Sequence, residues 1–161
     1  MELLKEKFKT NAEAAALEIK EIIKTHGAKK VGEVTLAQVY QGMRGITGLV
    51  TETSLLDAQE GIRFRGYSIP ELQARLPKAP GGGEPLPEGL FHLMLLGELP
   101  NQEDVEMITN ILQRRSHVPN HVFATIDALP INTHPMTMFV TGVMALQTES
   151  NFAKAYATGI N

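Results

Sequence analysis

One arginine in the sequence lies in a loop that could hold an anion. Arg44 is flanked by Gly42, Gly45 and Gly48 in the segment Gln-Gly-Met-Arg-Gly-Ile-Thr-Gly, residues 41–48. Glycine leaves the backbone sterically open, and a guanidinium can bind a phosphate through two parallel hydrogen bonds. Arg44 is therefore a candidate phosphate ligand. The alternative is that the segment is an ordinary glycine-rich turn.

The other charged residues that attract attention have simpler local explanations. Asp57, Glu60 and Glu71 stand at expected turns and helix starts, where carboxylates commonly accept backbone hydrogen bonds. Arg63 and Arg65 alternate with apolar residues, which is typical of the exposed polar face of a strand. We assign no catalytic role to the carboxylates and only a secondary interest to the two arginines.

The histidines do not form a recognisable metal site. They stand at positions 26, 92, 117, 121 and 134. His117 and His121 are four residues apart, but Pro119 lies between them at an expected helix start, so their rings would not share a regular helical face. We expect histidines here to cap and pack helices, and metal binding is the lesser alternative.

Several classes of protein find no support in the sequence. The chain has no cysteine, which excludes disulfides, thiolate nucleophiles and cysteine-ligated zinc. It has no Gly-x-Ser-x-Gly motif, and the three glycines at 81–83 are not followed by Lys-Ser or Lys-Thr, so neither a serine hydrolase nor a phosphate-binding P-loop is indicated. A net charge of -3 with 20% charged residues predicts no nucleic-acid-binding surface.

The apolar segments and the first residues predict no membrane span and no leader. The longest apolar stretch, residues 135–146, is interrupted by polar residues and falls short of the roughly 20 residues that cross a bilayer. The first seven residues mix acids and bases, whereas transit peptides are poor in acids and signal peptides have an apolar core. We therefore expect any targeting sequence to be missing from this chain.

Helical patterns dominate, so we expect a mainly α fold. Apolar residues recur at helical spacing over 2–26, and Gly27 ends the pattern. Further helices are predicted, separated by turns that contain proline: 35–40, 71–76, 88–97, 102–115, 120–128, 134–147 and from 150 onward. Short extended runs at 53–56 and 61–65 predict a small β-hairpin, and the Pro- and Gly-rich residues 77–87 predict a surface loop.

Local motifs predict where several of these helices begin. Ser68 and Glu71 have the spacing of a capping box, in which a side chain at each position bonds the backbone of the other. Thr35 can cap the short helix that runs to residue 40. Asn101 and Asn132, each in a turn with a proline, are candidate caps for the helices that follow.

The expected helix 134–147 is apolar nearly all round. A helix with so little polar surface must be buried on more than one side, either in a large core or against another subunit. Its small residues Thr137, Thr141, Gly142 and Ala145 would permit a close helix-helix approach. Both interpretations remain open, and both require more protein than this chain contains.

Several segments together carry a family resemblance. They include Gly-Met-Arg-Gly at 42–45, Glu-Thr-Ser at 52–54 and Glu-Gly-Ile-Arg-Phe-Arg-Gly-Tyr-Ser-Ile-Pro-Glu at 60–71. Further runs lie at 84–91, 134–136 and 149–156. These runs resemble the corresponding segments of eukaryotic mitochondrial citrate synthases. The resemblance covers nearly the whole chain from Gly32 onward, and its longest run is specific.

The resemblance implies a mostly helical homodimer that condenses acetyl-CoA with oxaloacetate and water to citrate and CoA in the mitochondrial matrix. Residues 1–161 would form the N-terminal part of its large domain, without the rest of that domain and without the small domain. No cofactor is implied, because the CoA thioester is a substrate. Arg44 would lie near the CoA phosphates, and the helices 120–128 and 134–147 would contribute to the dimer interface.

The resemblance also implies that catalysis is supplied by residues outside this chain. In the family, an aspartate removes a proton from the acetyl methyl group while a histidine stabilises the enol, and neither residue has a counterpart here. We therefore expect the isolated segment to be inactive and to supply scaffold, dimer surface and one phosphate contact. The alternative is a non-catalytic dimerisation or interaction fragment derived from the same fold.

Overall fold

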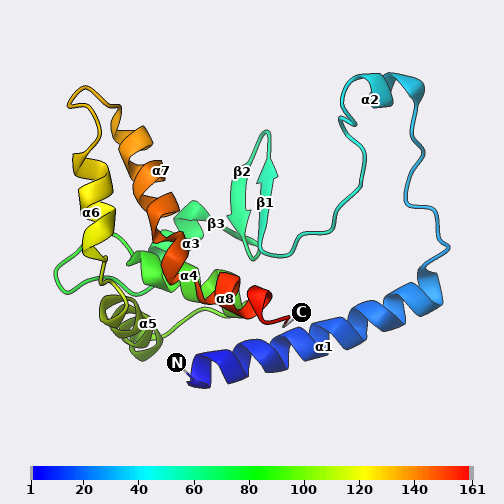
Figure 1. Ribbon diagram of the computed structural model, residues 1–161. Helices are drawn as coiled ribbons and strands as arrows, with labels where there is room; N and C mark the ends of the chain where they lie inside the picture. Colours follow the sequence, from blue (N-terminus) through cyan, green and yellow to red (C-terminus); the bar gives the residue numbers. More distant parts are fainter. Residues whose placement is uncertain (1, 160–161) are drawn as a thin grey trace. The chain divides into compact units, whose positions relative to one another are not determined.

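The computed structural model describes residues 2–159, which form two compact units (Figure 1). The first unit ends at Ile111 and the second begins at Leu112. Both are built mainly from helices, which confirms the predicted fold class, and a small three-stranded sheet lies in the first unit. Each unit is described by itself below.

Helix α1, Glu2–His26, opens the first unit and has the predicted length. It ends at Gly27, where a β carbon would overlap the carbonyl oxygen of Ile23, so only glycine fits there without a shift. Its N-terminal half contacts the end of a later helix, because Asn11 Nδ2 donates to Leu96 O at 3.0 Å and Lys7 Nζ lies 3.3 Å from Glu98 Oε1. Among residues 2–159, no helix is both long and apolar enough to cross a bilayer.

Helix α2, Leu36–Tyr40, is short and begins at the predicted cap, Thr35. The Thr35 side chain accepts a hydrogen bond from the backbone of Gln38, and the Gln38 side chain accepts one from the backbone of Thr35. This reciprocal capping box satisfies backbone groups that the first turn of a helix leaves free. The helix buries none of its residues, so local hydrogen bonds hold it.

The predicted hairpin is confirmed as strands β1, Ser54–Asp57, and β2, Gly61–Phe64, which pair antiparallel. At its turn, Asp57 Oδ1 accepts hydrogen bonds from the backbone N–H groups of Gln59 and Glu60, at 2.7 and 2.9 Å. A third strand that the sequence did not predict, β3 (Tyr67–Ser68), pairs with β2 and gives the order β1-β2-β3. Two residues carry too little alternation to signal a strand.

Helix α3, Ile69–Arg75, starts at the predicted capping box but two residues earlier than predicted. Pro70 lies in the first turn, where the missing N–H of proline costs no hydrogen bond, so the helix begins directly after Ser68. The loop that follows is closed by a bridge between Lys78 and Pro85. Helix α4, Pro87–Leu96, then runs to Gly97, which adopts the left-handed conformation (φ 81°) of a helix terminator.

The core of the first unit lies where α3 and α4 meet the sheet, and helix α5, Gln102–Arg114, packs against α4. Leu72, Leu76 and Leu93 are buried together, and Val105 and Ile108 of α5 are also buried. The partly buried residues packed against the leucines are Phe64, Tyr67, Leu90 and Leu99. Asn101 caps α5 as predicted, since its side-chain oxygen accepts from Asp104 N at 2.9 Å.

The second unit contains helix α6, Asn120–Asp127, and helix α7, Pro135–Ala145, followed by the 3-10 turn η1, Leu146–Glu149, and helix α8, Asn151–Ala157. Two expectations were wrong here. The apolar helix ends at Ala145 rather than at 147, and its cap is His134 rather than Asn132. Because Pro135 occupies the first helical position, the cap must be the residue directly before it, and the Met136 N–H donates to His134 Nδ1 at 3.1 Å.

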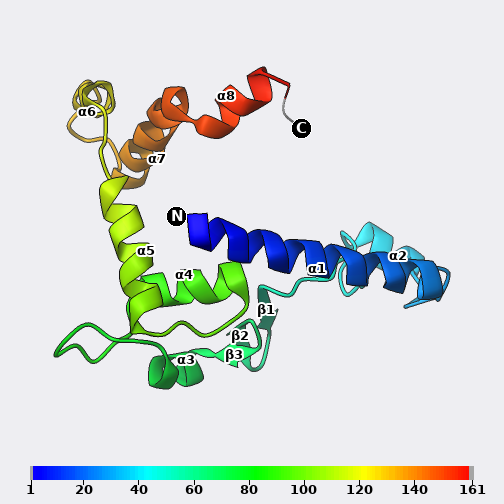
Figure 2. The same ribbon diagram turned by 90° about the horizontal axis from the view of Figure 1, so that it is seen from below.

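Helices α6 and α7 lie side by side and are packed closely (Figures 1 and 2). A β carbon on Gly142 would lie 2.9 Å from Ile126 Cδ1 and 3.7 Å from Val122 Cγ1, so this glycine permits the approach. His121 Nε2 lies 3.0 Å from Ala145 O, which joins the start of α6 to the end of α7.

Candidate anion-binding loop and apolar helix face

The loop that carries Arg44 has an unusual backbone. Gly42, Met43 and Gly45 all have positive φ, at 76°, 61° and 72°. Glycine adopts this region freely, whereas a residue such as methionine occupies it only under local restraint. Met43 is restrained by a hydrogen bond from its N–H to Gln38 O at 2.8 Å. The loop is therefore a defined turn that follows α2, and Arg44 lies at its exposed tip.

Arg44 is available to a ligand. Among residues 2–159, no carboxylate or carbonyl forms an ion pair or hydrogen bond with its guanidinium. A small cavity of about 110 Å³ lies beside the loop and is lined by residues 31–34 and 45–47. The sequence analysis proposes no second phosphate ligand for this loop. The prediction that Arg44 binds phosphate thus stays a prediction.

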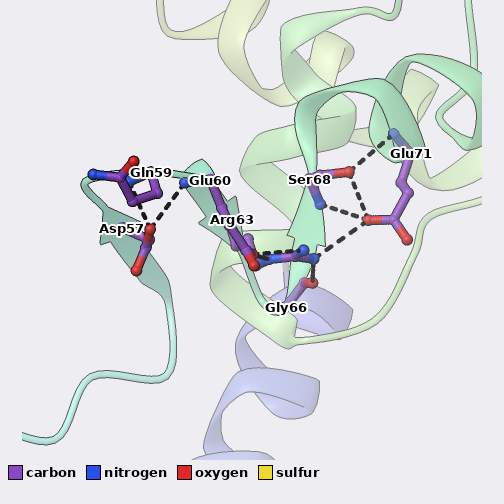
Figure 3. Close-up of polar contacts among 7 residues, drawn as sticks. All are labelled: Asp57, Gln59, Glu60, Arg63, Gly66, Ser68 and Glu71. Atoms are coloured by element: carbon purple, nitrogen blue, oxygen red, sulfur yellow. Dashed lines mark hydrogen bonds and ion pairs between the residues drawn. The ribbon is translucent and has the colours of Figure 1, made fainter.

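Arg63, in contrast, is engaged within the chain (Figure 3). Its guanidinium donates to Glu60 Oε2 at 3.1 Å and to Gly66 O at 3.1 Å, and it lies 3.7 Å from Glu71 Oε2. These contacts hold the turn after β2 against the start of α3. Arg63 therefore has a structural explanation and is not a site residue.

Glu71 and Asp57 have lowered pKa values, because each carboxylate accepts the hydrogen bonds expected at its position. The hydrogen bonds from the Ser68 hydroxyl and backbone lower the pKa of Glu71. Hydrogen bonds from the Glu60 and Gln59 backbones lower the pKa of Asp57. Each hydrogen bond favours the charged form. The predictions that Glu71 is a cap residue and Asp57 a turn residue are confirmed.

The expectation that Arg65 belongs to an exposed polar face was wrong. Its side chain is only 22% exposed, and its guanidinium donates to Met94 O at 2.8 and 3.2 Å. The alternation of β2 ends at Phe64, and Arg65 has a left-handed backbone (φ 48°), so the chain turns there and directs the residue toward α4. Arg65 thus caps the carbonyl group of Met94 near the end of that helix.

His92, His121 and His134 pack or cap helices, as predicted for the histidines. His121 and His134 make the contacts described above. His92 is fully buried (0% exposed), with Nδ1 3.3 Å from Glu98 O and Nε2 3.8 Å from Asp104 Oδ1. The burial of His92 was missed, although the helical spacing of Gly89, His92, Leu93 and Leu96 marks the inner face of α4. Within the described residues, no three His, Asp or Glu side chains gather at a metal-binding distance.

Helix α7 exposes most of its apolar residues. Only Gly142 is buried, while Met136, Phe139, Val140, Val143 and Met144 are exposed. The interpretation of this helix as part of a large core stays a prediction, because that core requires protein beyond the residues that the structure describes. The interface interpretation also stays a prediction, and it agrees with an apolar face that needs cover.

Comparisons with known proteins define the class to which this fold and loop belong. The family model described as citrate synthase, C-terminal domain, matches residues 42–159, which include the Arg44 loop, the sheet and α3 to α8. The match covers most of the chain.

Individual relatives are similar over nearly the full chain. The mitochondrial citrate synthase of Daucus carota is 57% identical over 143 residues, which are 89% of this chain and 30% of that protein. The mitochondrial citrate synthase of Saccharomyces cerevisiae is 53% identical over 158 residues, 98% of this chain and 33% of that protein. The chain belongs to the citrate synthase family, and it spans about a third of the length of these curated relatives.

Proposed function

We propose that this chain is part of a citrate synthase, which condenses acetyl-CoA with oxaloacetate and water to give citrate and CoA. The observation that carries the proposal is its identity of 53–57% to proteins named mitochondrial citrate synthase, over 89–98% of its length. On the same support we propose a mitochondrial matrix location. Residues 1–161 would be the N-terminal part of the large domain, and the remaining two thirds of such an enzyme would supply the catalytic residues.

Within that enzyme, we propose that Arg44 contacts a phosphate group of CoA. Its guanidinium has no partner among residues 2–159, and three left-handed residues shape the exposed turn around it. An arginine can bind a phosphate through two parallel, charge-assisted hydrogen bonds, which fix orientation as well as add affinity. Such a contact lies away from the reacting acetyl group, so it would hold the substrate without taking part in the chemistry.

We further propose that the α6–α7 pair forms part of a homodimer interface. Support comes from the exposed apolar face of α7 and from the close α6–α7 packing through Gly142, which gives the pair a defined surface. Apolar faces of this kind are usually covered in the assembled protein. The residues concerned would lie within 120–128 and 134–147.

The experiment is a kinetic comparison in a full-length enzyme that carries this segment, with CoA release measured by a thiol reagent. Arg44→Ala should raise the KM for acetyl-CoA by about tenfold, because a charge-assisted hydrogen bond to phosphate is worth on the order of 1.5 kcal/mol. The KM for oxaloacetate and the melting temperature should not change.

Arg115→Ala is the matched control, since Arg115 is also exposed and lies outside the loop. An unchanged KM for acetyl-CoA in Arg44→Ala would remove Arg44 from the CoA site, and a full-length enzyme that releases no CoA would remove the proposed activity. The 161-residue chain alone should release none.

The second candidate function, a non-catalytic dimerisation module, is favoured only by the exposed face of α7. Light scattering during size-exclusion chromatography of the 161-residue chain tests it. A folded monomer at tens of micromolar would exclude this alternative, since the module should associate through that face.

A further inference from the structure

We propose that Thr35 and Gln38 are positioning residues for Arg44, acting through the capping box at the start of α2. The inference rests on the proposed role of Arg44 in CoA binding. Neither residue is expected to touch the substrate. What points to them is that Gln38 bonds the residue before the arginine and lies beside the residue after it, while Thr35 orients the Gln38 side chain.

Gln38 lies next to the residues that come directly before and after Arg44. Its backbone oxygen accepts the hydrogen bond from Met43 N at 2.8 Å, which restrains the left-handed residue before the arginine. On the other side, a β carbon on Gly45 would lie 4.0 Å from Gln38 Nε2, so the side-chain amide lies beside the left-handed residue that follows. Gln38 is thus placed to fix the direction in which Arg44 leaves the loop.

Thr35 in turn fixes the orientation of the Gln38 side chain. Gln38 Oε1 accepts from Thr35 N at 2.9 Å and from Thr35 Oγ1 at 3.1 Å. Because the amide oxygen is held by these two donors, the amide nitrogen must face away from Thr35, toward Gly45. The Gln38 N–H completes the box by donating to Thr35 Oγ1 at 3.3 Å.

Packing does not provide an alternative restraint within the described residues. Helix α2 has five residues and buries none of them, and a helix of this length is unstable in isolation. Glycines at 42, 45 and 48 raise the entropy that must be lost when the loop is ordered. A loop ordered before the ligand arrives avoids that cost at binding, so the capping box should increase affinity for the CoA phosphate.

The test is a double-mutant cycle in a full-length enzyme that carries this segment. Thr35→Val removes the hydroxyl, and Thr35→Ser keeps it. Thr35→Val should raise the KM for acetyl-CoA by about three- to tenfold, in line with the usual effect of losing a helix cap, and Thr35→Ser should restore it. The kcat, the KM for oxaloacetate and the melting temperature should stay unchanged.

The same Thr35→Val change in an Arg44→Ala background should have no further effect, because residues that act through one another are not additive. An equal rise in both backgrounds, or no rise in either, would overturn the positioning role while Arg44→Ala alone still raises the KM. If Arg44→Ala has no effect of its own, both the positioning role and the proposed CoA contact are overturned.

Trypsin provides a readout that does not depend on activity. Cleavage after Arg44 should be about three- to tenfold faster in Thr35→Val than in the wild type and Thr35→Ser, since loss of the cap frees the loop. Cleavage after Lys29 and Lys30 should not change. An unaltered cleavage rate after Arg44 would overturn the restraint itself, whatever the kinetics of the enzyme.

Discussion

Helices α4 and α7 begin alike and are both largely apolar, yet one is buried and the other is exposed. Each has a proline in its first turn and few charged residues. In α4, Leu93 is 0% exposed because α1, α3 and α5 of the same unit surround the helix. In α7, Phe139 is 63% and Met144 68% exposed, although α6 is packed against the helix in the same unit. An apolar sequence therefore signals that a helix requires cover, but it does not identify what supplies the cover.

The polar contacts around α4 and around α7 also differ. Around the sheet and α4, Arg63 and Arg65 are held by carboxylate or carbonyl oxygens of the chain itself. The pair α6–α7 is joined by one polar contact, from His121 to the carbonyl of Ala145, and otherwise by apolar packing. The first region is stabilised from within, while the second retains a surface that another chain can complete.

The largest effect on the free energy of unfolding should come from truncating a buried side chain of α4. Leu93→Ala removes a fully buried side chain of α4 and should cost about 2–5 kcal/mol of unfolding free energy through lost burial and a cavity. Urea unfolding of the full-length enzyme measures this loss. Leu93→Met, which conserves volume, should cost less than about 1.5 kcal/mol. Similar losses for both variants would show that the α4 site is not tightly packed.

The next effect concerns the close contact between α6 and α7. Gly142→Val introduces a branched side chain where Ile126 Cδ1 would already lie 2.9 Å from a β carbon, so the two helices must separate. We expect a loss of about 1–3 kcal/mol in unfolding free energy. The smaller Gly142→Ala is the control and should cost less, since the end of a flexible isoleucine can move. A neutral Gly142→Val would mean that the helices are not packed this closely.

A substitution on the exposed face of α7 should weaken the proposed association of two chains and leave the fold intact. Phe139→Ser should raise the dimer dissociation constant by at least about tenfold, because burying a phenylalanine side chain contributes roughly 1.5–3 kcal/mol. Sedimentation velocity measures the change, with Val50→Ser as a control at another exposed apolar residue. If Phe139→Ser lowers the stability of the monomer and does not affect the dimer, the difference between α4 and α7 drawn above is wrong.

The smallest effect concerns Glu71, whose carboxylate accepts hydrogen bonds from Ser68. The pKa of Glu71 is lowered in the folded chain, so its contribution to stability is present above its ordinary pKa of 4.5 and is lost as the pH falls through the lowered value. The stability difference between wild type and Glu71→Gln should therefore shrink below about pH 4.5. Carbon-13 detected carboxyl titration should give a pKa for Glu71 below the ordinary glutamate value of 4.5. A pKa at or above that value would contradict the role of the Ser68 hydrogen bonds.

Features fixed by neighbouring residues could be predicted from the sequence. The cap at Thr35 and the capping box at Ser68 were correct because the groups that they bond lie three residues away, and the hairpin was correct because its turn is held by Asp57. The partial burial of Arg65 was missed, since it depends on Met94, which is distant in sequence, whereas the burial of His92 could have been inferred from the helical spacing of α4. For the candidate site, the exposed position of Arg44 followed from its glycines, whereas the contact of Gln38 with both sides of it required the folded backbone.

The contact between α1 and the end of α4 has a consequence for the order of synthesis. Asn11 bonds a carbonyl that lies 85 residues later, so at the usual rate of about 5–20 residues per second the chain grows for about 4–17 s before the partner exists. During that time, the face of α1 that contacts α4 lacks this partner. The contact between the two helices therefore forms only after α4 has left the ribosome.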